Sequence, residues 1–190
     1  MRRLALALCV ASVTAVPALA DDHAGMKMEH GMAMPIAHSD TMIHATVVGL
    51  DGKDLGMVML QDTPTGVLVT ADLKGLPAGE HGFHFHEKGV CDPAQKFATA
   101  GGHFAPGGTK HGLLVAGGPH GGDMPNQHVG ADGVLDAQVL NTGVTLAPGD
   151  HSLLDADGSA LVIHAKPDDY KTQPSGDAGD RIACAVIKAG

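Results

Sequence analysis

The segment MIHATVVGLDGKDLGMVMLQDTPTGVLVTADL, residues 42–73, contains three short runs of strand type, with an Asp-Gly turn signal at Asp51 between the first two. No part of the chain shows a sustained helical period. Many short strands joined by turns predict an all-β domain, either a sandwich or a barrel. The runs of strand type in the whole chain are 42–50, 55–62, 65–73, 81–87, 133–140, 159–166 and 181–188.

Two long stretches, roughly 88–127 and 167–180, do not fit strands. Long ordered loops in a compact β domain usually carry function. We therefore expect the functional residues to lie in these loops or beside them.

The first twenty residues have the three parts of a secretory signal: a basic start at Arg2 and Arg3, an apolar stretch, and a small-x-small end at Ala20. We expect cleavage after Ala20, export to the periplasm, and no membrane anchor. Residues 21–40 lack any strand or helix period and are expected to form a flexible arm. The domain proper is expected to span 41–190.

Export determines how the cysteines are interpreted. Cys9 would leave with the signal, and Cys91 and Cys184 would remain as one pair in an oxidising compartment, where a disulfide is the default. A bridge that closes a loop of this length is worth about 4–5 kcal/mol in the chain-entropy model. The formal net charge of −9 makes nucleic acid an unsuitable partner.

The segment GFHFHEKGVC, residues 82–91, places His84 and His86 two residues apart in a strand-like run. Side chains alternate along a strand, so both imidazoles point the same way, about 6.7 Å apart. Such a pair can hold one metal ion. The alternative is a pair of exposed surface histidines.

A glycine-rich loop follows, and it carries three histidines and a carboxylate that suit tetrahedral zinc: His103, His111, His120 and Asp123. The alternative is a polar, solvated loop. His164 ends an apolar run far downstream, where a histidine is either structural or a ligand. We expect His44, His81, His128 and His151 to be structural or exposed.

Together these motifs resemble the copper/zinc superoxide dismutase family, in its bacterial periplasmic form, over about residues 42–188. GFHFHEKG is similar to the family's copper-binding strand, and the loop spacing of 8, 9 and 3 residues is similar to its zinc loop. GDAGDRIACAVI, residues 176–187, is similar to its C-terminal signature. The resemblance implies an eight-stranded Greek-key β-barrel with long metal-binding and electrostatic loops.

The resemblance also implies one copper and one zinc ion per subunit, with His103 bridging the two. It makes Asp168 a carboxylate that joins a histidine of each metal site, Arg181 the cation that attracts superoxide, and Cys91–Cys184 the disulfide. No ligand position is lost, unlike in copper-only or non-catalytic relatives. The implied copper ligands are His84, His86, His103 and His164, and the implied zinc ligands are His103, His111, His120 and Asp123.

The implied activity is conversion of superoxide to O2 and hydrogen peroxide through alternating Cu(II) and Cu(I). The alternative is a periplasmic copper-binding or copper-delivery protein on the same fold, which would need neither zinc nor Arg181. The resemblance is compatible with either a monomer or a homodimer.

The arm mixes imidazole and thioether groups, a combination that suits copper, with methionine favouring Cu(I). The alternative is a disordered leader with no metal role. The residues concerned are His23, Met26, Met28, His30, Met32, Met34 and His38.

Overall fold

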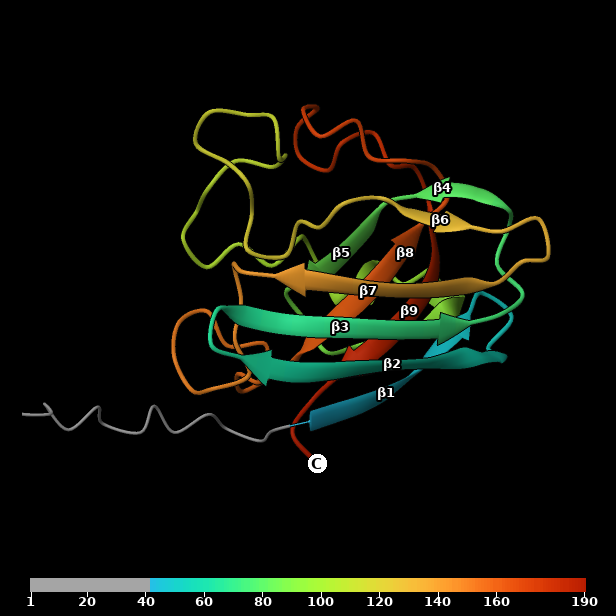
Figure 1. Cartoon of the computed structure of the whole chain (residues 1–190), viewed down its shortest axis with the longest axis horizontal. Helices are drawn as coiled ribbons and strands as arrows, with labels where there is room; N and C mark the ends of the chain where they lie inside the picture. Colours follow the sequence, from blue (N-terminus) through green and yellow to red (C-terminus); the bar gives the residue numbers. More distant parts are fainter. Residues whose placement is uncertain (1–41) are drawn as a thin grey trace, which may run out of the picture. The chain divides into compact units, whose positions relative to one another are not determined.

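The computed structural model describes residues 42–190, and the expected signal and arm lie outside this range. The described chain is almost entirely β-structure, with two short 3₁₀ helices (Figure 1). It contains no helix that is both long and apolar enough to cross a membrane. The strands are β1 (Met42–Gly49), β2 (Asp54–Thr63), β3 (Gly66–Leu73), β4 (Gly79–His81), β5 (Phe83–His86), β6 (Gln127–Val129), β7 (Leu135–Asn141), β8 (Ser159–His164) and β9 (Arg181–Ile187).

Seven of these strands form one antiparallel sheet in the order β5-β8-β9-β1-β2-β3-β7, and β4 pairs with β6 in a second, two-stranded sheet. The sheet curls around a core in which alternate residues of β1, β2, β3 and β7 are buried, as the period of two in the sequence predicts, whereas every residue of β5 and β8 is buried. Nine strands are described where about eight were expected.

The difference in strand count has a local cause. The expected strand 81–87 is interrupted at Gly82, whose amide donates to the carbonyl of Lys166 and whose carbonyl accepts from the amide of His164. The chain therefore changes partner, so that β4 pairs with β6 and β5 pairs with β8. The expected run 81–87 therefore belongs to two strands, and β6 is too short to leave a pattern in the sequence.

The two long loops stand where the sequence predicts them. Residues 87–126 contain only the 3₁₀ helices η1 (Pro93–Gln95) and η2 (Ala98–Ala100), and residues 165–180 contain no helix or strand. Figure 1 shows the two loops on the same side of the sheet, beyond the ends of β5 and β8. Side-chain hydrogen bonds join them, because Gln173 both donates to the carbonyl and accepts from the amide of His111.

Candidate metal centre

The strand β5 presents two histidines to one side and two phenylalanines to the other. Phe83 and Phe85 are fully buried in the main hydrophobic core. Because side chains alternate along a strand, this burial directs His84 and His86 together to the opposite side. The neighbouring strand β8 ends at His164, which lies beside them.

Four buried histidines form a first cluster. Each offers one ring nitrogen, and these four atoms lie within 4.8 Å of one another. His103 enters from the long loop through an isolated β-bridge to His86. The members are His84, His86, His103 and His164.

A second cluster shares His103 with the first and adds a carboxylate. Oδ1 of Asp123 lies 2.8 Å from Nδ1 of His103, 3.1 Å from Nδ1 of His111 and 3.5 Å from Nδ1 of His120. The other oxygen, Oδ2, accepts from the amides of Gly112 and His120. The three rings are therefore gathered around one fixed carboxylate oxygen.

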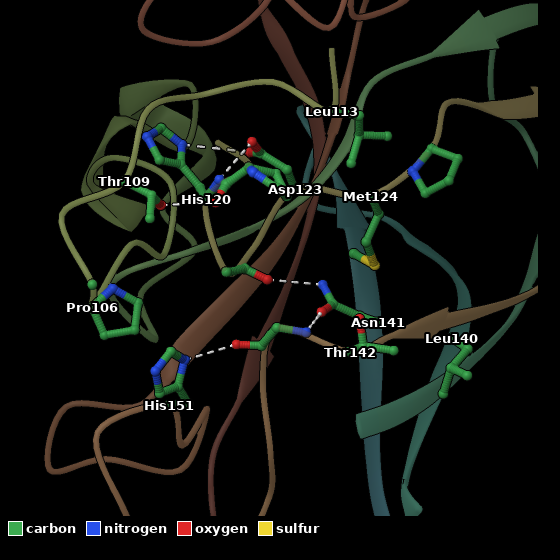
Figure 2. A pocket seen from close by; sticks show the side chains of 15 residues that line it. Pro106, Thr109, Leu113, His120, Asp123, Met124, Leu140, Asn141, Thr142 and His151 are labelled. Atoms are coloured by element: carbon green, nitrogen blue, oxygen red, sulfur yellow. Dashed lines mark hydrogen bonds and ion pairs between the residues drawn. The ribbon is translucent and has the colours of Figure 1, made fainter. Parts of the chain in front are cut away.

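The loop that carries Asp123 is attached to the end of β7 by Asn141. Nδ2 of Asn141 donates to the carbonyl of Gly121 at 3.0 Å, and its Oδ1 accepts from the amide of Gly143 (Figure 2). Figure 2 also shows His120 and Asp123 among the residues that line a pocket. This pocket has a volume of about 440 Å³. The rigid sheet thus positions the second cluster through one buried amide side chain.

In the first cluster, neighbouring groups determine which nitrogen of each ring faces inward. Nε2 of His84 donates to Asp168, which leaves Nδ1 directed into the cluster. Nδ1 of His86 donates to the carbonyl of Gly101 at 3.1 Å, and Nδ1 of His164 donates to that of Gly179 at 3.3 Å. A carbonyl oxygen only accepts, so Nε2 is left with a lone pair on both rings.

Metal ions fit this arrangement, because several inward atoms have no other partner. Nδ1 of His84, Nε2 of His103 and Nδ1 of His120 are buried without a hydrogen bond. The Nε2 atoms of His86 and His164 face each other at 3.4 Å, lone pair to lone pair. Buried polar atoms are almost always satisfied, and one cation in each cluster would satisfy these atoms.

Three rings of the first cluster, those of His84, His86 and His164, are neutral near pH 7. Burial lowers the pKa of His84 to about 4, against an opposing hydrogen bond to Asp168. Burial, with the nearby His84, lowers the pKa of His164 to about 3, and burial also holds the pKa of His86 well below its usual value. Neutral imidazole is the form that binds metal, so these rings are ready to coordinate.

In the second cluster, the pKa of His111 is shifted in the opposite direction. Burial disfavours a charged His111, but hydrogen bonds to Asp123 and Asp168 outweigh it and raise the pKa of His111 to about 9. Burial likewise opposes charge on the two carboxylates, yet hydrogen bonds from the histidines hold the pKa of both well below the usual range. An anionic carboxylate with three imidazoles is a donor set that zinc prefers.

Asp168 connects the two clusters from behind. Its Oδ2 accepts from Nε2 of His84 at 2.9 Å, and its Oδ1 lies 3.1 Å from Nε2 of His111. Its own amide donates to Asn126. The turn at Gly176 packs against this carboxylate with a φ of +69°, and a Cβ there would collide with Asp168. One buried carboxylate thereby orients a ring of each cluster.

A cavity of about 230 Å³ opens onto the first cluster, and Arg181 is the only cation among its lining residues. Nη1 of Arg181 donates to the carbonyl of Phe97 at 2.7 Å, and Nη2 donates to that of Gly101 at 2.6 Å. Burial lowers its pKa from the usual value, but a guanidinium stays charged in proteins. The cavity therefore presents a fixed positive charge beside His86 and His164.

The disulfide expected between Cys91 and Cys184 is present, 93 residues apart in sequence. Both cysteines belong to or pack on a second small core around Phe97, which is fully buried. Because the carbonyl of Phe97 holds Arg181, the disulfide anchors the segment that positions the guanidinium.

The structure thus brings together every expected site residue within residues 42–190. Three lysines of the chain could also guide an anion by their charge, but they do not line the cavity: Lys88, Lys166 and Lys171. The carbonyls of Gly101 and Gly179 and the side chain of Gln173 were missed. A backbone carbonyl leaves no signal in residue identity, and Gln173 is one glutamine in a polar loop.

Both ring nitrogens of His81 lie at hydrogen-bond distance from carbonyl oxygens, 2.7 Å from that of His164 and 2.8 Å from that of Pro77. These two contacts fix the orientation of the ring between the backbone of His164 and that of Pro77. His81 thus supports the backbone of His164 from outside the clusters, in keeping with the structural role expected for it.

Comparison with known proteins gives a consistent result. Residues 55–187 match the family model for copper/zinc superoxide dismutase. Copper/zinc superoxide dismutase 2 of Aquifex aeolicus is 49% identical over 151 residues, which cover 78% of this chain and 88% of that protein. The copper/zinc enzyme of Caulobacter vibrioides is 49% identical over 147 residues, which cover 76% and 84%.

Solved structures agree with the sequence matches and with the expected Greek-key β-barrel. A superoxide dismutase-like protein from Bacillus subtilis aligns with a TM-score of 0.72 at 38% identity, covering 76% of this chain and 97% of that one. The copper/zinc superoxide dismutase from Brucella abortus aligns with a TM-score of 0.63 at 29% identity, covering 77% and 99%. With the family model matched over most of the described domain, this chain belongs to the copper/zinc superoxide dismutase family.

Proposed function

We propose that the chain converts superoxide to O2 and hydrogen peroxide at the first cluster, with copper there and zinc in the second. The observation that carries this proposal is the shared ring of His103, whose Nδ1 lies by Asp123 while its buried Nε2 has no partner. The proposed copper ligands are His84, His86, His103 and His164, and the proposed zinc ligands are His103, His111, His120 and Asp123.

The donor chemistry supports this order of metals. Four imidazoles accept copper in either oxidation state, whereas three imidazoles with one anionic carboxylate suit zinc, which has no redox chemistry. When bound, copper supplies the electron exchange: one superoxide gives up an electron and leaves as O2, and a second takes it with two protons and leaves as hydrogen peroxide.

The remaining steps belong to the protein's own groups. Arg181 attracts and orients the anion in the cavity, because a guanidinium offers fixed donors to a small anion. Nε2 of His103 takes up and returns a proton during the cycle. Asp168 keeps the rings of His84 and His111 in one tautomer, so the inward nitrogens stay available.

A copper-delivery protein would use neither the carboxylate cluster nor a guanidinium fixed at the mouth of the metal site. Both features are present, and the relatives from Aquifex aeolicus, Caulobacter vibrioides and Brucella abortus are copper/zinc superoxide dismutases, which favours the enzyme. We further place the protein in the periplasm, exported through residues 1–20. The disulfide supports an oxidising compartment.

The decisive experiment measures superoxide consumption by the copper- and zinc-loaded protein beside His84→Ala. His128→Ala is the matched control, because His128 pairs with Glu80 on the exposed two-stranded sheet. Fast consumption that is lost in His84→Ala and kept in His128→Ala is expected. A protein that binds both metals but consumes superoxide no faster than free copper would instead support the copper-delivery function.

We also propose that residues 21–40 gather copper through their imidazole and thioether groups. Deleting them should slow copper loading when copper is limiting and leave activity unchanged once metal is saturating. Equal loading rates with and without the segment would contradict this role.

A further inference from the structure

We propose a second kind of metal site on this molecule, a site for a soft monovalent cation such as Cu(I) on the outer face of β1 and β2. Its donors are the imidazole of His44, the thioether of Met59 and one further thioether, from Met57 or from Met42, which flank His44 on opposite sides. The site goes beyond the dismutase function and does not depend on residues 21–40.

The strand register places these four side chains on one face. His44 lies directly opposite Met59, and Met42 precedes His44 by two residues on β1. Met57 precedes Met59 by two residues on β2, which places it diagonal to His44. Cross-strand partners have Cβ atoms about 4.5–5.5 Å apart, and diagonal neighbours about 7–8 Å. Their alternation partners Ala45, Val47, Val58 and Leu60 are buried in the core.

Neither core packing nor strand preference explains these methionines. Residues 42–190 contain four methionines, of which only Met124 is a core residue. Met42 is 44% exposed and Met57 is 47% exposed. Exposed strand positions favour β-branched and polar residues, and unbranched methionine normally fills gaps in cores. Three of the four instead surround one exposed histidine.

The donor set selects the class of metal. Thioether and imidazole groups favour soft ions such as Cu(I), whereas hard divalent ions prefer carboxylate and carbonyl oxygens. Methionine has three rotatable bonds, so its sulfur can move to meet an ion beside His44. Asp72 lies opposite Met57, and both line a shallow depression of about 410 Å³ together with Asp54 and Lys74, so two carboxylates and one ammonium lie near the donors.

This face is separate from the metal centre. In the sheet order, β9 lies between β1 and β8, and Figure 1 shows β1 and β2 on the side of the sheet away from the long loops. The site would therefore hold copper on the surface of an enzyme that also binds copper as its cofactor, without competing for the buried ligands.

The test uses the copper- and zinc-loaded mature protein with ¹³C-labelled methionine methyl groups. Ag(I), a redox-inert probe for Cu(I), is added while the methyl signals are followed by NMR. The signals of Met57 and Met59 should shift together at the same Ag(I) level. His44→Ala should move that transition to about tenfold higher Ag(I) or beyond, and Thr70→Ala, which neighbours Met59 without removing a soft donor, should not.

The proposal is overturned if the Met57 and Met59 signals stay unchanged while Ag(I) binds elsewhere, or if His44→Ala leaves the transition where it was. Superoxide consumption should be equal in all three forms. A protein that binds Ag(I) as expected but fails to consume superoxide would contradict the proposed function and leave this site standing.

Discussion

Arg181 is positioned by two carbonyl oxygens, of Phe97 and Gly101, and not by a side-chain partner. The carbonyl of Gly101 also accepts from Nδ1 of His86, so one backbone group holds both the cation and a proposed copper ligand. Gly101 has a φ of +75°, and a Cβ there would collide with Glu87. A glycine is needed at this point because the backbone itself is part of the site.

We expect Arg181→Ala to lower kcat/KM for superoxide by about tenfold or more with copper content unchanged, because the cavity loses its cation. Arg181→Lys should retain part of the rate, since an ammonium keeps the charge but not both carbonyl contacts. Stopped-flow rates across ionic strength give the measurement. The salt dependence should be weaker in the alanine variant, and equal slopes in both proteins would argue against an electrostatic role.

Metal uptake should differ in pH dependence between the two clusters. With a pKa raised to about 9, His111 is protonated at neutral pH and must lose its proton to bind zinc, so zinc affinity should rise with pH by about tenfold per unit below that value. His84 and His164, with pKa values of about 4 and 3, are already neutral, so these two rings should release no protons when copper binds.

Titration calorimetry of the metal-free protein in buffers of different ionisation enthalpy measures this proton release. Asp168→Asn is the matched control, because it removes one of the two carboxylates that raise the pKa of His111. Zinc should release fewer protons from this variant. Equal proton release for copper and zinc in the unmodified protein would show that the assigned charge states are wrong.

At the scale of elements, the site is built from β5, the end of β8 and the long loops that the strands hold in place. The long loop is attached to the last strand by Cys91–Cys184 and to β7 by Asn141, and the later loop is attached to it by Gln173. Each attachment joins segments that are distant in sequence. The loops can therefore position ligands with little regular structure of their own.

Replacing both Cys91 and Cys184 by serine should lower the free energy of unfolding by about 2–5 kcal/mol. It should also reduce activity in the protein that remains folded, because the small core around Phe97 loosens and Arg181 loses a fixed acceptor. Denaturant unfolding and the dismutation rate well below the transition separate the two effects. A fully active folded variant would mean that the disulfide serves stability alone.

At the scale of the whole molecule, the curled sheet and the metal centre are complementary sources of stability. The sheet buries a continuous apolar core, whereas the loops are joined to it through polar groups, several of which lack partners without an ion. Any ligand that binds only the folded state raises stability by mass action. Two metals that join loop residues to strand residues should raise the stability of the folded state strongly.

Removing both metals should therefore lower Tm and increase amide exchange mainly in residues 102–124 and 165–180. The sheet amides of β1, β2 and β3 should exchange slowly in both states, because their hydrogen bonds do not depend on the ions. Hydrogen exchange with and without metal provides the measurement. A uniform increase across the sheet would show instead that the fold itself depends on metal.

Residue identity and spacing were enough to predict an all-β fold, the two long loops, the cysteine pair, the His84–His86 pair and the loop set of three histidines and a carboxylate. The ligand role of His164 and the sharing of His103 were implied only by the resemblance to the family. Imidazoles and carboxylates are the groups that bind metal, and period-two runs indicate strands wherever one face is buried. These features are local or depend on residue type, so they can be read along the chain.

Only the tertiary structure decided the break at Gly82, the pairing of β4 with β6, the carbonyls that orient His86 and Arg181, and the meeting of His44 with three methionines across β1 and β2. Each depends on the register between segments or on a backbone atom. Every residue has the same backbone carbonyl, and register is set by packing and hydrogen bonds between distant parts of the chain, so residue order alone does not reveal either.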